Sequence, residues 1–333
     1  MKYKLYLLGL LSLMTACKHH EIQPESVLPA PAVQTELDTW LEEHISRPYQ
    51  AEVIYRWDKN NASQASFIYP PQTAKVRPVM EALEATVLKM YKDKAFFPSK
   101  DFMPNAPLLR IYLYGGGNID QQGVDLPFDR VSPATELKIY NVDKFNPQDP
   151  DEVYRLVRSA QHQIAKHLMD IHPYDHNKFI KISHNKYINS TEDIADAFKS
   201  YTNSRESLKE AIGLNRYAWS RGFYSILGLL SPKEDLAEMY SVTLTSTPSE
   251  INHAEQDATV PDEATGDSLA ERLYAERAKE AHQAFVLKRK FISDYIKAEW
   301  GISLQRLQLY SLTLINPVSY THLRAHETRH DLV

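Results

Sequence analysis

The sequence predicts an α+β protein in which a small β-sheet precedes a mostly helical half. Short runs rich in β-branched and aromatic residues stand in the first half of the chain, whereas long stretches with apolar residues at helical spacing dominate after residue 150. The chain has 333 residues, of which 43% are hydrophobic, so it can bury a substantial core. We expect a sheet-rich part over residues 36–150 and a helical part over 151–316.

The sheet-rich part is expected to open with a short amphipathic helix over 36–45. Strands are predicted at 51–57, at 66–69, where Pro70-Pro71 closes the strand, at 108–114 and at 137–142. The residues of 74–91 place their apolar side chains on one side of a helix. The only glycine cluster, Gly115-Gly116-Gly117-Asn118, is explained by a turn without any ligand.

The helical part is expected to be organised around residues 151–173, DEVYRLVRSAQHQIAKHLMDIHP. Pro150, Asp151 and Glu152 mark its start, because proline and acidic side chains favour the first turn of a helix. His162 and Lys166 lie one turn apart, on a face separate from the apolar one. A zinc-hydrolase helix would carry H-E-x-x-H in this frame, with two imidazoles on the metal and a glutamate that activates water. This chain has His162-Gln163-x-x-Lys166 instead.

Beyond this helix the pattern predicts shorter elements and one long helix. We expect an irregular stretch over 173–183, short helices over 192–201 and 207–212, a helix from Ser231 through Tyr240, and an acidic surface loop over 246–268. Residues 269–300 form a long amphipathic pattern that ends at Gly301. A further helix is expected to be under way at 311–315.

The N-terminus predicts a lipoprotein. Lys2 and Lys4 precede an apolar run, residues 5–16, that is too short to span a bilayer, and the run ends in Leu-Met-Thr-Ala-Cys17, which resembles a bacterial lipobox. Cys17 is the only cysteine, so an intramolecular disulfide is excluded. We expect a signal peptide over 1–17, acyl chains on Cys17 that anchor the protein to a membrane, and a flexible tether over 18–35.

Composition excludes some function classes. The formal net charge of −5 gives no reason to expect nucleic acid as a partner.

Near the C-terminus, His322, His326 and His330 are spaced like ligands on a helix. However, residues 318–333, VSYTHLRAHETRHDLV, resemble translated sequencing-adapter read-through, so residues 317–333 are interpreted as a non-native tail without a metal-binding role.

Several strings, in their order along the chain, resemble a family of proteins. They are ELDTWLEEHISRPYQAEVIYRW (36–57), VRPVMEALE (76–84), the central helix ending in HPY, KFIKIS (178–183), SPKEDLAEM (231–239) and DYIKAEWGI (294–302). Their combination is similar to the substrate import-associated zinc metallohydrolase lipoproteins of Bacteroidetes, which are zinc-binding metallopeptidases with an H-E-x-x-H helix. The resemblance spans roughly residues 36–307 and implies a zincin-like helical half, within a metallopeptidase-like domain over 36–316.

The resemblance implies which positions would carry the metal. The first ligand falls on His162, the second on Lys166, and the third on Glu234, with Glu238 as an alternative one turn later. The catalytic glutamate falls on Gln163. Two candidate ligands therefore remain, as the remnant of a degraded site.

Each replacement has a chemical consequence. Gln163 cannot take a proton from water, and loss of a general base costs about 10²–10⁴ in rate. The family's tyrosine falls near Leu227, which cannot donate a hydrogen bond to an oxyanion. The ammonium of Lys166 repels a metal cation, but it can neutralise carboxylates that a lost metal leaves buried. We therefore expect Lys166 to contact Glu234 or Glu238. A local alternative for Glu234 is a capping box with Ser231, favoured by Pro232.

Two classes of function follow. The first is a non-catalytic accessory or binding lipoprotein of the outer membrane, on its periplasmic or cell-surface side, without a cofactor. The resemblance implies that it would serve a TonB-dependent, SusC/SusD-like nutrient import system, with a peptide or a glycan as the imported substrate. The second is an active zinc hydrolase, a peptidase that uses His162, Glu234 and a loop histidine from among His172, His176 and His184. A third option is a purely structural subunit of the import complex.

Overall fold

The computed structural model describes residues 34–57, 68–97, 108–119, 125–126, 135–183, 186–188, 190, 216–262 and 266–315. The chain divides into two units, Met1–Thr39 and Trp40–Val333. The described part of the first unit contains the beginning of α2 (Glu36–Leu41). All later elements belong to the second unit. The predicted signal peptide, Cys17, the tether over 18–33 and the tail over 317–333 lie outside the described residues.

The second unit opens with a helix that runs further than predicted. A π-helical turn η1 (Glu42–Ser46) and the short α3 (Arg47–Tyr49) continue α2, and Gln50 ends the helix in the left-handed region with φ of 56°. The next helix is as expected, with α4 (Thr73–Leu83), η3 (Glu84–Leu88) and α5 (Lys89–Lys92) in direct succession. Val76, Met80 and Val87 are fully buried on its inner side.

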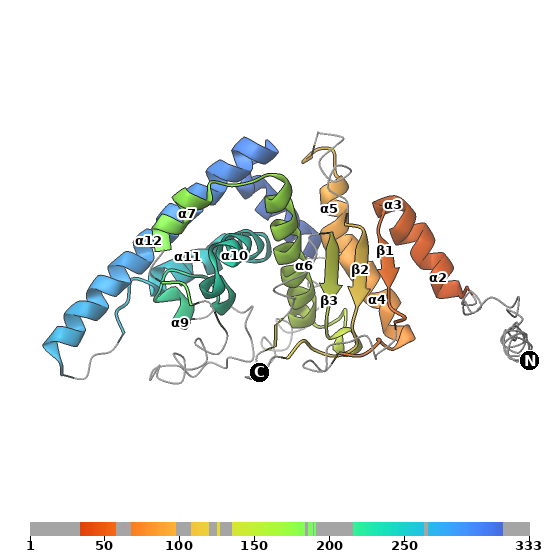
Figure 1. Ribbon diagram of the computed structural model, residues 1–333, viewed down its shortest axis with the longest axis horizontal. Coiled ribbons are helices and arrows are strands. Elements are labelled where there is room, and N and C mark those ends of the chain that lie inside the picture. Colours follow the sequence, from red (N-terminus) through yellow and green to blue (C-terminus); the bar gives the residue numbers. More distant parts are fainter. Residues whose placement is uncertain are drawn as a thin grey trace, which may run out of the picture. The chain divides into compact units, whose positions relative to one another are not determined.

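The described strands form one parallel sheet in the order β1-β2-β3 (Figure 1). Its strands are β1 (Glu52–Ile54), β2 (Arg110–Leu113) and β3 (Glu136–Ile139). Val53 pairs with Ile111, which in turn pairs with Leu137. The side chains of β2 and β3 alternate between buried and more exposed, as expected for strands with one covered face. Each strand is shorter than its predicted run.

Two features of the predicted sheet were wrong. Ile68 and Tyr69 are not in a strand, while residues 66 and 67 of the same predicted run lie outside the described residues. Val142 begins the 3₁₀ turn η4 (Val142–Lys144) instead of ending a strand, since Asn141 takes a left-handed conformation with φ of 59°. The β-propensity of these residues was overridden by the turns that follow them.

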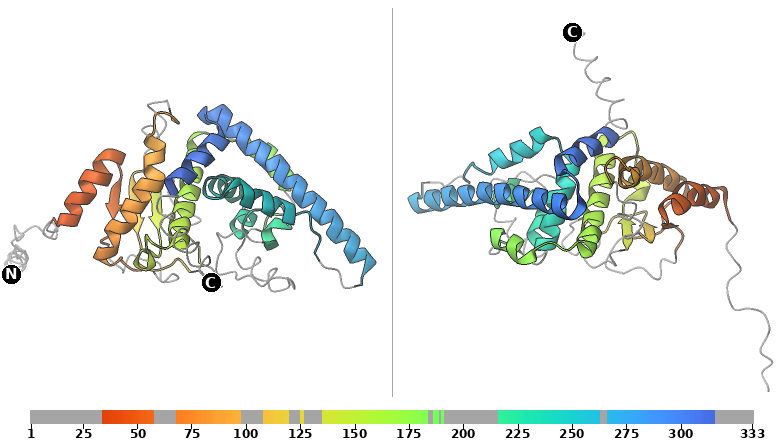
Figure 2. Two further views of the ribbon diagram at one scale, coloured as in Figure 1. Left: turned by 180° about the vertical axis from the view of Figure 1, so that it is seen from behind. Right: turned by 90° about the horizontal axis from the view of Figure 1, so that it is seen from above.

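The central helix α6 (Pro150–Ile171) confirms the main sequence prediction. Asp149 caps it by accepting a hydrogen bond from the Asp151 amide at 3.0 Å, and Pro150 occupies its first position. The buried face includes Val153, Val157, Ala160, Ile164 and Leu168. Beside β3 on one side and α10 (Pro232–Thr245) on the other, α6 connects the sheet with the helical half (Figures 1 and 2).

The helical half contains α7 (His176–Ser183), α9 (Arg216–Trp219), η5 (Ile226–Leu230), α10, α11 (Pro248–Asp257) and the long α12 (Ser268–Trp300). Gly301 ends α12 with φ of 68°, as predicted. Residues 304–315 form another helix, so 311–315 lie within a helix as expected. The predicted helices over 192–201 and 207–212 lie outside the described residues. No helix in the described part of the chain combines the length and apolarity needed to cross a membrane.

Two segments expected to be irregular are helical. The predicted irregular stretch over 173–183 is irregular only at 173–175. Its remainder forms α7, in which Phe179 and Ser183 are buried on one face while the histidine and lysines around them stay at the surface. α11 lies within the predicted acidic loop. Thr247 and Glu250 form a reciprocal capping box at its start, which satisfies the first amides of the helix.

Candidate functional site

A buried network of charges joins α6 to α10 at the position of the predicted site. The two helices each carry their polar side chains at four-residue spacing, so His162 and Lys166 of α6 meet Glu234 and Glu238 of α10. The imidazole of His162 bridges both acids, with Nε2 at 2.6 Å from Glu234 Oε2 and Nδ1 at 2.5 Å from Glu238 Oε1. These four residues and Arg158 form one network, which we call the α6–α10 network.

Lys166 makes the contact expected from the sequence. Its Nζ donates to Glu234 Oε1 at 2.5 Å, and the side chains are 16% and 6% exposed. Burial disfavours the ionised form of Glu234, but the hydrogen bond and charge of His162, followed by those of Lys166, outweigh it and lower the pKa of the carboxyl. Glu234 is therefore a carboxylate whose two oxygens both have a cationic or imidazole partner.

Glu238 is held by more donors than any sequence argument suggested. Arg158 donates to it from Nη1 at 3.2 Å and from Nη2 at 2.7 Å, and Ser225 donates from its hydroxyl. Burial raises the pKa of Glu238, but Arg158, His162 and Ser225 together lower it to about 2. With His162 added, this carboxylate is fully occupied, which makes Glu238 an anchor of the network rather than an open ligand.

The contacts of His162 engage both nitrogens of its ring. Each ring nitrogen lies within hydrogen-bond distance of an oxygen of a buried glutamate. A metal ligand needs the lone pair of one ring nitrogen directed at the metal ion, whereas both nitrogens here are directed at carboxyl oxygens.

Gln163 turns away from this network toward the sheet. Its Nε2 donates to the carbonyl of Lys138 at 2.8 Å, and its Oε1 accepts from the amide of Lys138 at 2.9 Å. The amide of Gln163 thus satisfies both main-chain groups of one residue of β3, which is one of the two edge strands of the described sheet. A glutamate could make only the second of these bonds.

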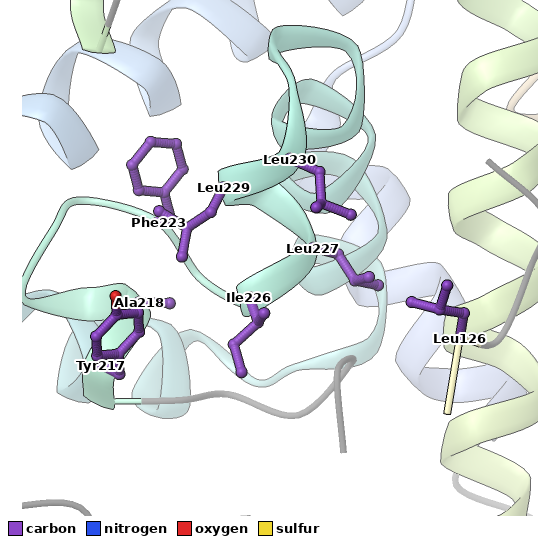
Figure 3. Packing of buried hydrophobic residues seen from close by; sticks show 8 residues of the cluster. All are labelled: Leu126, Tyr217, Ala218, Phe223, Ile226, Leu227, Leu229 and Leu230. Carbon is purple, nitrogen blue, oxygen red and sulfur yellow. The ribbon is translucent and has the colours of Figure 1, made fainter. Parts of the chain in front are cut away.

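Leu227 lies in an apolar environment. It belongs to η5 and is buried in a hydrophobic cluster, where its side chain points toward Leu126 (Figure 3). The cluster consists of Leu126, Tyr217, Ala218, Phe223, Ile226, Leu227, Leu229 and Leu230. Its packing gives Leu227 a structural explanation that needs no reacting group.

Glu234 does not form the complete capping box that its spacing suggested. Ser231 does cap α10, by accepting from the Glu234 amide at 3.2 Å. The carboxylate of Glu234 does not return to Ser231 and binds His162 and Lys166 instead. The local signal therefore predicted the role of Ser231 correctly and that of the Glu234 side chain incorrectly.

Comparison with known proteins places this arrangement in a family. The family described as "Putative zinc-binding metallo-peptidase" matches residues 30–305. The chain belongs to this family. The fold is similar to that of a crystal structure from Bacteroides caccae, titled a putative zinc-binding metallo-peptidase, with a TM-score of 0.58 and 16% sequence identity over 88% of this chain and 97% of that one. None of the curated proteins compared with the chain matches it.

Membership in the metallo-peptidase family implies zinc, but the residues present do not fit it. Within the described ranges, no three His, Cys, Asp or Glu side chains converge in a way that could hold a metal ion. His162 has both nitrogens directed at carboxylates, and the ammonium of Lys166 lies against Glu234 where a second neutral ligand would be required. No catalytic step through a metal follows from this geometry.

Two of the three loop histidines that could complete a zinc site lie within the described residues. His176 Nδ1 lies 3.3 Å from the hydroxyl of Tyr174, and the main-chain carbonyl of His172 accepts from the hydroxyl of Tyr295 at 2.5 Å. His184 lies outside the described residues. The assignments of His162 and Glu234 as remnant ligands, with Glu238 as the alternative, stay predictions from the resemblance.

Proposed function

We propose that this chain is a non-catalytic member of the metallo-peptidase family that acts as an accessory or binding protein. The observation that carries the proposal is the ion pair between Lys166 and Glu234, next to a His162 that is hydrogen-bonded through both nitrogens. The side chains of Arg158, His162 and Lys166 here meet the two carboxylates of Glu234 and Glu238 between α6 and α10. In the proposal, this network has replaced the metal as the link between the two helices.

The loss of a general base supports the same conclusion. Gln163 stands at the position of the catalytic glutamate, and its amide is bonded to Lys138 of β3. It is thus unable to accept a proton from water and is also held away from His162 by two hydrogen bonds. Hydrolysis would need a base, a metal and an oxyanion donor together, and Leu227 provides no such donor.

Metal content and turnover test the proposal directly. The purified chain, incubated with zinc and then dialysed, should hold far less than one zinc per molecule and should leave a mixture of unlabelled peptides intact. The matched control is the double variant Q163E/K166H, which restores the H-E-x-x-H spacing and should gain zinc if the scaffold has kept the remaining ligands. Stoichiometric zinc in the unmodified chain, with peptide cleavage that a chelator abolishes, would instead establish the active hydrolase.

The cellular part of the proposal rests on the lipobox-like segment before Cys17 and on the family resemblance. We infer an outer-membrane lipoprotein that works with a TonB-dependent, SusC/SusD-like import system for peptides or glycans. The expected results are that the chain fractionates with outer membranes, that C17S releases it, and that cross-linking on intact cells captures a TonB-dependent transporter. Membrane retention of C17S would contradict the anchor, and capture of proteins without any transporter would contradict the import role.

A further inference from the structure

The loops that follow β2 and β3 meet at the carboxyl end of the sheet. The amide of Asn141 donates to the Gly116 carbonyl at 2.9 Å, and the amide of Asp143 donates to the Gly115 carbonyl at 3.2 Å. The amide of Leu126 donates to the Asn118 carbonyl at 2.9 Å. In parallel sheets this end, where loops from neighbouring strands converge, is where ligands commonly bind. The glycine cluster that the sequence explained as a turn is therefore part of a more specific arrangement.

Asn141 and Asp125 form a pair at this point with two oxygens left over. Asn141 Nδ2 donates to Asp125 Oδ2 at 3.0 Å, and this contact fixes which end of the Asn141 amide carries the oxygen. Asn141 Oδ1 and Asp125 Oδ1 are both shielded from solvent, and neither has a hydrogen-bond partner among the residues that the structure describes. A buried polar atom without a partner costs about 1–3 kcal/mol, so two adjacent ones call for an explanation.

Gly117 brings the two oxygens to one place. A Cβ built on this buried glycine would lie 3.0 Å from Asn141 Oδ1 and 3.2 Å from Asp125 Oδ1. The absence of a side chain at this position is thus what allows both oxygens to approach the same part of the loop. Any larger residue at 117 would press directly on them.

The chemistry of this group is that of a hard cation site. Both unpartnered atoms are acceptors, one belongs to a carboxylate, and no nitrogen donor in the described ranges bonds to either. Ca²⁺ is bound by carboxylate, amide and main-chain oxygens at about 2.3–2.6 Å, with water completing the shell. Burial raises the pKa of Asp125, while Asn141, Lys144 and Arg155 oppose this shift. A bound cation would favour the ionised carboxylate further.

We propose that Asp125, Asn141 and the loop at Gly117 form a calcium site that ties the loops after β2 and β3 together. One carboxylate and one amide oxygen make this a weak site, with Kd on the order of 10⁻⁴–10⁻³ M, in the range of extracellular calcium modules. It is a structural site that is chemically unlike the zinc centre of the family. It shares no residue with the α6–α10 network.

The test uses the full-length chain in detergent, stripped of metals with a chelator. Added CaCl₂ should raise the midpoint of thermal unfolding by about 2 °C or more at saturation, and equilibrium dialysis should find one Ca²⁺ per chain. MgCl₂ at the same ionic strength controls for a general salt effect. D125N, which keeps the shape of the side chain and removes its charge, should weaken calcium binding at least tenfold, and D294N, at an exposed acid of α12, should leave it unchanged.

Two results would overturn the proposal. If the chain takes up no calcium and its unfolding midpoint is the same in CaCl₂ and MgCl₂, the two oxygens are satisfied by water. If D125N binds calcium as the unmodified chain does, the ion lies elsewhere. Should D125N fail to fold, G117A provides a second route, because its added methyl group would meet both oxygens and should abolish binding. Neither result depends on zinc, so the calcium proposal and the proposed function fail separately.

Discussion

Two salt bridges between α6 and α10 offer a direct measure of what the α6–α10 network contributes. Lys166 and Glu234 are 2.5 Å apart with side chains 16% and 6% exposed. Lys233 and Asp170 are also 2.5 Å apart, but their side chains are 38% and 46% exposed. The two pairs connect the same helices over the same distance and differ in burial. If the network stabilises the contact between these helices, the buried pair must contribute clearly more.

The expected magnitudes follow from burial. Exposed ion pairs contribute about 0.2–1 kcal/mol in double-mutant cycles. Removal of one partner from a buried pair costs about 3–5 kcal/mol, since the other charge is left without compensation. Lys166 keeps some exposure, so K166M should lower the free energy of unfolding by about 3 kcal/mol, at the low end of that range. The coupling energy between K166M and E234Q should reach about 2 kcal/mol, against less than about 1 kcal/mol for K233M with D170N.

Urea unfolding at neutral pH, followed by circular dichroism, measures both cycles. The m-value should stay constant, so that changes in midpoint report stability alone. High salt provides an internal control, because it should reduce the exposed coupling and leave the buried one almost intact. Equal coupling energies in the two cycles, or a cost of less than about 1 kcal/mol for K166M, would refute the argument that Lys166 compensates a buried acid.

Three further predictions concern other parts of the fold. Burial raises the pKa of Asp235 to about 6 despite its ion pair with a buried lysine, so the ionised carboxylate opposes folding above that pH. Protonation of Asp235 should therefore contribute a gain in stability as the pH falls from 7 to 4. D235N should abolish this gain, which urea unfolding at the two pH values measures. Q163A should speed hydrogen exchange of the Lys138 amide and lower the free energy of unfolding by about 1–3 kcal/mol. Unchanged exchange would contradict the two hydrogen bonds between Gln163 of α6 and Lys138 of β3. G222A should lower the unfolding midpoint more than G301A, because both glycines have positive φ but only Gly222 is crowded by α12.

The sequence predicted the long helices and the three strands of the described sheet, and it missed two short helices, α7 and α11. α6 and α12 have many turns of periodic apolar residues and clear terminal signals, so local pattern and tertiary packing agree. α7 and α11 are only eight and ten residues long. Isolated helices of this length are unstable in water, so their formation depends on burial of residues such as Phe179 and Ile251 in the folded chain. The capping box of Thr247 and Glu250, with Pro248 at the first helical position, was the local signal that could have predicted α11.

Part of the site could also be predicted from the sequence. Arg158, His162 and Lys166 follow one another at four-residue spacing on α6, so a row of three basic side chains could have been predicted to face an acidic row. The contact of Lys166 with Glu234 was predicted by a different argument, from the family resemblance and the carboxylates that a lost metal would leave buried. The donation from Ser225 to Glu238 could not be, because Ser225 lies between separate elements and its position depends on the packing of η5 against α10.

The network predicts that the two substitutions that introduce H-E-x-x-H would cost stability. Removal of Lys166 would free one oxygen of Glu234, but Glu238 would still hold Nδ1 of His162 and would itself remain bound to Arg158 and Ser225. A glutamate at 163 could not donate to the carbonyl of Lys138, which now accepts a hydrogen bond from the Gln163 side-chain amide. Because each of these contacts satisfies a buried group, each change exposes an unpaired charge or main-chain atom before any metal is gained. We therefore expect Q163E/K166H to bind zinc only at a clear loss of stability in the metal-free form, and a double variant as stable as the unmodified chain without zinc would show that the network contributes little.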